Sequence, residues 1–496
     1  MGPKKAHRMT HDNANTRPGT VDADTPAPAD TRAQRGRWIV LTAVSLGLLL
    51  ATIDTSILYI AVPVLVDALG ASTSESLWII NMYPLVMTGL LLGTGTLGDR
   101  YGHKRVFLLG IALFGLASLI AAFSPTPGIL IFSRALLAVG AALMLPATLA
   151  IIRMTFDDER ERNIAIAVWS SVSIGGIAFG PLVGGLLLEW FWWGSVFLIN
   201  VPIVIVTFIL ITNFAPKAAE ESAVPWDLVS SIWALVGLTG LVAAIKEIAS
   251  TSPSATIIGI SLVSAVVGFA LFLIRQRRLD TPLLDFTIFR DAALAAGVLA
   301  AGLSTFVFAG IGAVTSLYFQ TAAGYTPLQT GLLVGCIAAG ATITSLASGS
   351  LLTCIGPRAL LLVAAVLAGL GYGLATLALN AHIIWLGLSL FVAGTGIGVL
   401  ITVASSTIIT NVAPERAGMA SAVEEVSYEF GSLLSVTVLG SIYAAVTQAG
   451  GSGAEGYRLV LLIALGTCGA AFFGLSLILQ PASMFANRPK TVVHRA

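Results

Sequence analysis

Charged side chains are scarce in this chain. Only 10% of its 496 residues are Asp, Glu, Lys or Arg, whereas 56% are hydrophobic and the mean hydropathy is +0.92. Soluble domains carry about 25% charged residues, so a soluble chain of this composition would lack the polar groups needed to cover its surface. The net charge of +1 offers no basic footprint for nucleic acid. The composition therefore predicts a protein whose main solvent is lipid.

Cysteine is also scarce, and its placement excludes the common uses of a thiol. Cys336, Cys354 and Cys468 lie in separate apolar stretches, at no spacing typical of a metal site, and we interpret them as packing residues. The polar loops contain no ATP-binding loop, no metal-ligand spacing and no Ser-His constellation. The sequence thus predicts neither an enzyme nor a bound cofactor or metal.

What the chain does have is a series of long apolar runs. A helix needs about 20 mostly apolar residues to cross a bilayer, and fourteen stretches qualify. They lie near 38–66, 77–97, 106–123, 129–152, 163–188, 194–214, 228–247, 256–275, 294–320, 329–352, 358–378, 382–411, 416–446 and 457–480. An even number of spans places both termini on the same side of the membrane.

The distribution of Lys and Arg indicates which side of the membrane the termini occupy. Of the 26 Lys and Arg residues, 23 fall on the side of the N-terminal tail, Lys246 and Arg458 fall on the other, and Arg134 lies inside a span. By the positive-inside rule, both tails are expected in the cytoplasm and the protein in the cytoplasmic (inner) membrane of a bacterium. The N-terminal tail is rich in Pro, Thr and Asp and has no apolar run, so it is not a signal peptide.

Two charged inner stretches divide the spans into groups of six, two and six. We expect an all-α integral membrane fold in which two six-helix bundles flank two inserted helices, a pattern that indicates a duplicated transporter bundle. The expected boundaries are a disordered tail at 1–36, a bundle at 37–216, the insert with its linkers at 217–290, a second bundle at 291–482 and a tail at 483–496. The sequence identifies no chemistry in the insert.

Few ionisable residues lie within the spans, and each needs a physical reason. A charged side chain at mid-membrane costs at least about 2.5–3.5 kcal/mol, so it should face a cavity or a partner. The candidates for proton coupling are Asp54, Arg134, Glu424, Glu425 and Glu429. Glu425 and Glu429 share a helix face, whereas Glu424 points about 100° away. The alternatives are a position near the inner surface for the glutamates and a snorkelling arginine at 134.

Such carboxylates suit an exchange of protons for cations. A carboxylate in a dry site favours its protonated form until the site opens to water, and once ionised it attracts a cation. We expect the substrate to contact Asp54, Glu425 and the neighbouring Tyr428, together with Asn81 and Tyr83 near the start of the second span. For each aromatic residue alone, ordinary packing is the alternative.

Two glycine-containing strings indicate where helices approach each other closely. The loop after the second span reads GTLGDRYGHKR, with Gly95, Gly98, Asp99, Arg100, Gly102, Lys104 and Arg105 as its key residues. The fifth span contains GIAFGPLVGG, with Gly176, Gly180, Pro181, Gly184 and Gly185. Small residues permit close helix packing and the proline permits a bend. The first string is otherwise a basic loop that only sets topology.

These two strings resemble signatures of the major facilitator superfamily. The resemblance implies that the first is an inner gate that stabilises the outward-open state, and that the second is the motif that separates antiporters from importers. The similarity runs from Trp38 to the last span and is closest to the fourteen-span drug:proton antiporters, including quaternary-ammonium exporters. The segments 197–202, 324–331 and 413–429 carry that closer resemblance. In that family an arginine at the place of Arg134 takes part in proton transfer.

The chain departs from the family pattern at several places. The second copy of the gate loop, GSLLTCIGPR at 349–358, lacks the acidic residue, so the gate is expected to work from the first half. Leu137 and Ala138 stand where Gln and Gly usually follow the span arginine, and Asn81 stands where many relatives carry an acidic residue. The chain therefore has one membrane carboxylate fewer than those relatives, which is expected to affect the transport of dicationic substrates and the number of protons exchanged per cycle.

The sequence as a whole predicts a proton-driven antiporter. It would export lipophilic cationic drugs by alternating access, act as a monomer, use the proton gradient as its energy source and have protons, lipophilic cations and lipid as its partners. A proton symporter of the same fold, an exporter of a non-cationic metabolite and a non-transporting membrane scaffold are the alternatives.

Overall fold

The computed structural model describes residues 28–216, 227–250, 252–279, 282–284, 291–410 and 417–478, and within these ranges it contains helices and no strand. Of the tail expected at 1–36 to be disordered, residues 1–27 lie outside them, whereas residues 28–36 belong to the first helix, which corrects the expectation there. Residues 217–226, 280–281 and 285–290 of the expected linkers and the residues from 479 also lie outside the described ranges. The helices are α1 (Pro28–Leu69), α2 (Thr73–Tyr101), α3 (His103–Ala122), α4 (Pro127–Thr155), α5 (Glu159–Trp190), α6 (Ser195–Leu198), α7 (Asn200–Phe214), α8 (Leu228–Ile248), α9 (Ala255–Gln276), α10 (Ala292–Thr321), α11 (Pro327–Ile355), α12 (Pro357–Ala378), α13 (Ile383–Thr410), α14 (Ala417–Gln448) and α15 (Gly453–Ile478).

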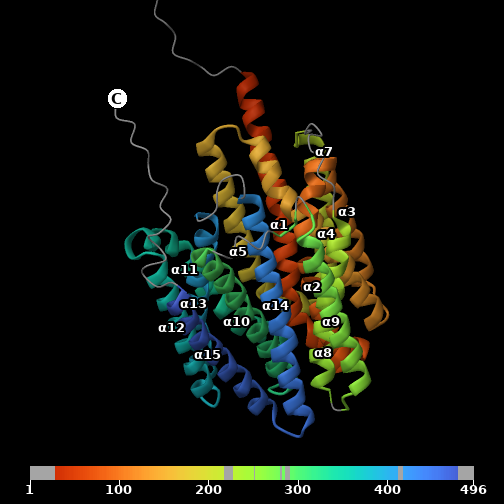
Figure 1. Ribbon diagram of the computed structural model, residues 1–496, viewed down its shortest axis with the longest axis vertical. Coiled ribbons are helices and arrows are strands. Elements are labelled where there is room, and N and C mark those ends of the chain that lie inside the picture. Colours follow the sequence, from red (N-terminus) through yellow and green to blue (C-terminus); the bar gives the residue numbers. More distant parts are fainter. Residues whose placement is uncertain are drawn as a thin grey trace, which may run out of the picture.

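With α6 and α7 taken as one interrupted helix, the fourteen expected spans are confirmed. Thirteen of these helices are long and apolar enough to cross a membrane by the described residues alone. The fourteenth, α2, has 29 residues, some of whose side chains lie outside the described set. The chain is therefore a multi-pass membrane protein. We call the end of the molecule at which α1 begins the proximal end, at the top of Figure 1, and the opposite end the distal end.

The helix ends repeat between the two halves of the chain. At the distal start of α2, Ser72 and Glu75 form a capping box, and at the start of α11 Thr326 and Gln329 form another. At the proximal ends, Gly102 (φ 88°) separates α2 from α3, and Gly356 (φ 81°) separates α11 from α12. Both turns need a backbone that favours glycine. The same local signals at matching places support an internal duplication.

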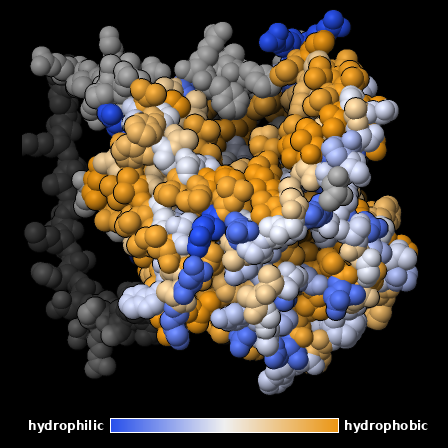
Figure 2. Space-filling view, turned by 90° about the horizontal axis from the view of Figure 1, so that it is seen from below, coloured by the Kyte–Doolittle hydropathy of each residue, from blue (hydrophilic) through white to orange (hydrophobic). Residues whose placement is uncertain are grey.

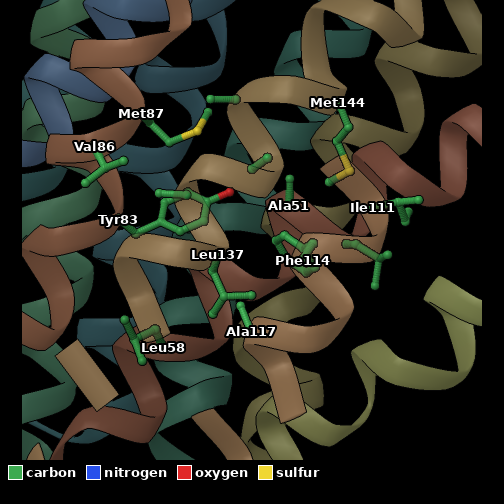
Figure 3. Close-up of a cluster of buried hydrophobic side chains, with 14 of the residues drawn as sticks. Ala51, Leu58, Tyr83, Val86, Met87, Ile111, Phe114, Ala117, Leu137 and Met144 are labelled. Atoms are coloured by element: carbon green, nitrogen blue, oxygen red, sulfur yellow. The ribbon is translucent and has the colours of Figure 1, made fainter. Parts of the chain in front are cut away.

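Each half has its own apolar core. One large cluster of buried side chains draws mostly on α1 to α7, and two others draw on α10 to α15. Figure 3 shows part of the first, where residues of α1 to α4 interdigitate around Tyr83. The inserted helices α8 and α9 pack on each other and stand beside α2 at the edge of the molecule (Figure 1).

The two halves meet through α2 with α14 and α5 with α11. Among the described residues, the hydrogen bonds that cross between the halves lie toward the distal end. Asn81 donates to the Thr437 hydroxyl at 2.9 Å, Gln320 donates to the Ile60 carbonyl at 2.9 Å, and Tyr59 lies 3.4 Å from the Ser432 hydroxyl. Figure 2, seen from the distal end, shows hydrophilic patches among extensive hydrophobic surface. The halves are thus held together at their distal ends.

Candidate functional site

A buried ion pair lies within the first half. Arg134 of α4 donates a hydrogen bond to Asp54 of α1, and the two residues are 0% and 2% exposed. Asn200, the first residue of α7, donates to the other oxygen of Asp54 at 3.3 Å and contacts the Ser118 hydroxyl at 3.2 Å. The predicted Asp54 and Arg134 are therefore brought together, and Arg134 is not a snorkelling residue.

Tyr83 completes this group from α2. The guanidinium carbon of Arg134 lies 4.7 Å from the centre of the Tyr83 ring, a cation–π contact that is strongest where water is excluded. The Arg134 Nε has no hydrogen-bond partner. Removing a guanidinium from water while one of its donors stays unpaired is costly. A group retained at that cost inside a membrane protein is a candidate functional site.

The three glutamates of α14 do not form one cluster with Asp54. Glu424 is buried and accepts a hydrogen bond from the Tyr428 hydroxyl at 3.0 Å. Glu425 and Glu429 are half-buried, and neither has an ion pair among the described residues. Glu429 interacts electrostatically with Arg134 and Tyr83, whereas Glu424 and Glu425 interact electrostatically with Tyr428. The structure thus divides the predicted acidic set into two groups, and Glu429 is the glutamate with an electrostatic interaction with Arg134.

Asn81 occupies a different place from Tyr83. It is fully buried where α2 meets α14, and its Nδ2 donates to Thr437 while its Oδ1 has no partner. Both predicted substrate contacts on α2 are thus buried in this conformation, Asn81 between the halves and Tyr83 within the first.

The loop between α2 and α3, which carries the first glycine string, is hydrogen-bonded to its own half. Gly98 leaves room for the His103 ring, because a Cβ atom at 98 would lie 2.3 Å from it. Lys104 Nζ donates to the carbonyls of Thr212 and Ala215 at 2.9 and 2.8 Å, and so caps the C-terminus of α7 with a positive charge. Arg100 is exposed. Gly95 and the Asp99 side chain lie outside the described set.

The glycines of α5 meet two different helices. Cβ atoms at Gly176 and Gly180 would lie 2.0 and 1.8 Å from the hydroxyls of Thr52 and Ser56 on α1, and Gly184 faces Ile57. Gly185 faces the backbone of Leu328 on α11, and the Pro181 carbonyl would lie 2.5 Å from a Cβ at Gly331. This string therefore sets the spacing within the first half and also between the halves.

Two buried polar residues were missed as site residues. Asn200 stands in an apolar run, and the sequence marks it only as part of the segment 197–202 that resembles relatives. Pro202 agrees with a helix that begins at Asn200, because proline is favoured in the first turn. Lys246, expected on the side opposite the N-terminal tail, lies within α8 and is only 8% exposed. Its Nζ lies 4.1 Å from the centre of the Trp78 ring and donates to the Ser74 carbonyl at 2.9 Å. The residues on either side of Lys246 in the sequence, 244–245 and 247–248, do not predict this contact.

Comparisons with known proteins agree with this architecture. The sequence profile described as "Major Facilitator Superfamily" matches residues 44–423. The chain is 35% identical over 419 residues to the multidrug efflux pump LfrA of Mycolicibacterium smegmatis, covering 84% of this chain and 83% of LfrA. It is 36% identical over 406 residues to the methyl viologen resistance protein SmvA of Salmonella typhimurium, covering 82% of each.

The fold agrees as well. The crystal structure of the nucleoside transporter NupG (D323A mutant) superposes with a TM-score of 0.60 at 14% identity, covering 90% of this chain and 99% of NupG. At that identity the likeness concerns the fold alone. The extent of the profile match and the identity to two transporters over most of their length together show that the chain belongs to the major facilitator superfamily.

Proposed function

We propose that this protein is a proton-coupled antiporter that exports lipophilic cations from the cytoplasm. The observation that carries the proposal is the Asp54–Arg134 pair, buried within the first half, and Glu429 of the second half interacts electrostatically with Arg134. The relatives LfrA and SmvA, which are named for multidrug efflux and methyl viologen resistance, support a drug as the substrate. The basic residues on the proximal side support a cytoplasmic location for that end.

In this proposal Glu425 and Glu429 of α14 bind the exchanged ions. While the distal ends of the halves are closed, Arg134 is held by Asp54, and Glu425 and Glu429 have no ion pair among the described residues. Unpaired carboxylates on one helix face attract either a proton or an organic cation. Binding one expels the other, so exchange follows from competition for the same oxygens.

The movement between the halves completes the cycle. The distal contacts Asn81–Thr437 and Gln320–Ile60 would separate as the halves rock, and the carboxylates would then face the outside. Protons entering there displace the cation and later leave to the cytoplasm. The membrane potential supplies about 2.3 kcal/mol per net charge moved per 100 mV. Exchange of one monovalent cation for one proton moves no net charge, so it would be driven by the pH difference alone.

Inverted vesicles test this function. After the vesicles have been energised to acidify their interior, a fluorescent pH probe reports the gradient while ethidium or a quaternary ammonium is added. We expect the cation to dissipate the gradient with the wild type but not with Asp54→Asn, Glu425→Gln or Glu429→Gln. Asp67→Asn is the matched control, because Asp67 is an exposed carboxylate near the distal end of α1. If no lipophilic cation moves protons, the function is a different one.

A further inference from the structure

The same kind of contact joins the first and the fifth span of each half. In the first half these spans are α1 and α5, and the Ser56 hydroxyl of α1 hydrogen-bonds the Gly176 carbonyl of α5 at 3.2 Å. In the second half they are α10 and α14, and the Thr305 hydroxyl of α10 donates to the Tyr428 carbonyl of α14 at 2.9 Å. The Thr305 hydroxyl lies farther, at 3.4 and 3.2 Å, from two carbonyls of its own helix. Its shortest hydrogen bond therefore joins α10 to α14.

That bond lies in a turn of α14 that carries an acidic side chain. The Tyr428 carbonyl belongs to the peptide bond that joins Tyr428 to Glu429. Just beyond Glu429, Gly431 allows α10 to approach closely, because an added Cβ there would overlap the Gly302 carbonyl and the Thr305 hydroxyl. Helix α10 thus contacts the backbone of α14 on both sides of Glu429.

Other hydrogen bonds hold the same region of α14. The Tyr428 hydroxyl donates to Glu424 at 3.0 Å and lies 3.4 Å from the Ile401 carbonyl of α13. Further along α14, the Ser435 hydroxyl donates to the Phe306 carbonyl of α10. The backbone around Glu429 is therefore held against α10 and α13 together, and α10 holds it at the peptide bond of Glu429 itself.

The position of this turn matters because Glu429 acts across the interface between the halves. Glu429 interacts electrostatically with Arg134, Tyr59 and Tyr83, all of which belong to the first half. The energy of such an interaction depends on distance. A shift of the turn would therefore change both the interaction of Glu429 with Arg134 and the negative charge that a cation meets there.

Helix α10 also carries a contact that closes the distal end. The Gln320 side chain, about 22 Å further along α10 than Thr305, donates to the Ile60 carbonyl of the first half at 2.9 Å. The helix that fixes the turn of Glu429 thus also holds the distal ends of the two halves together.

We propose that Thr305 is a positioning residue for the transport site, whose hydrogen bond to the Tyr428 carbonyl holds Glu429 where it binds the exchanged cation. This inference rests on the proposed function. Thr305→Val keeps the shape of the side chain but removes the hydroxyl. The turn then loses its hydrogen bond to α10 at the peptide bond of Glu429. Because small displacements of a positioned group can lower its effect many-fold, the cation should bind more weakly.

Direct binding of tetraphenylphosphonium to the purified protein in lipid nanodiscs tests this role. We expect Thr305→Val to raise the Kd several-fold and Thr305→Ser, which restores the hydroxyl, to return it close to that of the wild type. Thr305→Ala, which removes the hydroxyl without adding a methyl group to the helix contact, should weaken binding as Thr305→Val does. Thr376→Val is the matched control, because the Thr376 hydroxyl donates to the Gly373 carbonyl of its own helix, α12, and should leave the Kd unchanged.

A second pair of variants asks whether Thr305 acts through Glu429. If it does, Glu429→Gln should itself raise the Kd, and adding Thr305→Val to that variant should raise it little further, because two residues that act as a unit are not additive. A Thr305→Val variant that loses thermal stability but keeps the Kd of the wild type would overturn the inference, since the role of Thr305 would then be structural. So would equal fold-changes from Thr305→Val with and without Glu429→Gln. If the wild type binds no tetraphenylphosphonium, the proposed function itself fails, and that result is distinct from the others.

Discussion

Breaking the Asp54–Arg134 pair from its two sides should give unequal losses of stability. Removing one partner of a buried ion pair costs about 3–5 kcal/mol, because the other charge stays behind. Arg134→Met leaves Asp54 with the hydrogen bond from Asn200, and a carboxyl group can also become neutral by binding a proton. Asp54→Asn leaves a guanidinium that cannot lose its charge and that keeps only uncharged contacts, the amide oxygen of the new side chain and the Tyr83 ring, the latter worth about 2 kcal/mol. Asp54→Asn should therefore be the more harmful change.

The double variant separates this explanation from simple loss of packing. With both charges removed, no uncompensated charge remains, and replacing a buried ion pair by uncharged groups is often nearly neutral. We expect the double variant to be more stable than Asp54→Asn, with a coupling free energy of about 2–3 kcal/mol. Equilibrium unfolding in mixed micelles measures all three variants, and Arg100→Met, at an exposed position, should change stability by less than about 0.5 kcal/mol. A double variant whose loss equals the sum of the single losses would refute the reasoning.

Three further predictions concern other parts of the chain. Gly180→Val should impair folding or transport by forcing α5 away from α1, at a cost of about 1–3 kcal/mol, whereas Gly175→Val should be tolerated because its nearest neighbouring atom is 4.0 Å away; thermal unfolding compares the two. Asn81→Ala should remove the hydrogen bond to Thr437 between the halves, worth about 1 kcal/mol. It should therefore increase the reaction of a thiol introduced by Ser441→Cys, a buried position one helical turn from Thr437, with maleimide added from the distal side. Burial opposes ionisation of Asp227, but hydrogen bonds from Arg275 and Ser230 outweigh it and lower the pKa of its carboxyl group below the ordinary value of 3.8. Ionised Asp227 therefore stabilises the packing of α8 on α9 at any pH above 3.8, and this contribution is lost only as the pH falls through the lowered pKa. Hydrogen exchange of α8 should therefore respond to Asp227→Asn at pH 7 and no longer in strong acid.

The sequence predicted the membrane fold well because the signals for spans are strong and local. Apolar length gave the fourteen helices, and the glycine strings of the gate loop and of α5 pointed to places where backbones approach closely. The insertion cost of Asp54 and Arg134 singled them out before their contact was known.

Partnerships between distant residues were not available from the sequence. Hydropathy does not reveal that Asn200 joins Asp54, or that Lys246 turns back onto Trp78, since each contact depends on how separate helices rotate about their axes. The same limit explains why Glu424, Glu425 and Glu429 were treated as one acidic group. Their spacing fixed their angles on α14, but only the packed bundle shows that Glu424 accepts a hydrogen bond from Tyr428 while Glu429 interacts electrostatically with Arg134 of the other half.

The separation of the ion pair along the chain also has a consequence for biosynthesis. Asp54 and Arg134 are 80 residues apart, and Asn200 follows Asp54 by 146. At about 5–20 residues per second, a ribosome makes Arg134 roughly 4–16 s after Asp54. For that interval the first helix holds an acidic side chain with no native partner. Release of α1 alone into lipid would therefore carry the cost of that acidic group, about 2.5–3.5 kcal/mol for the charged form, and the arrival of α4 removes this cost.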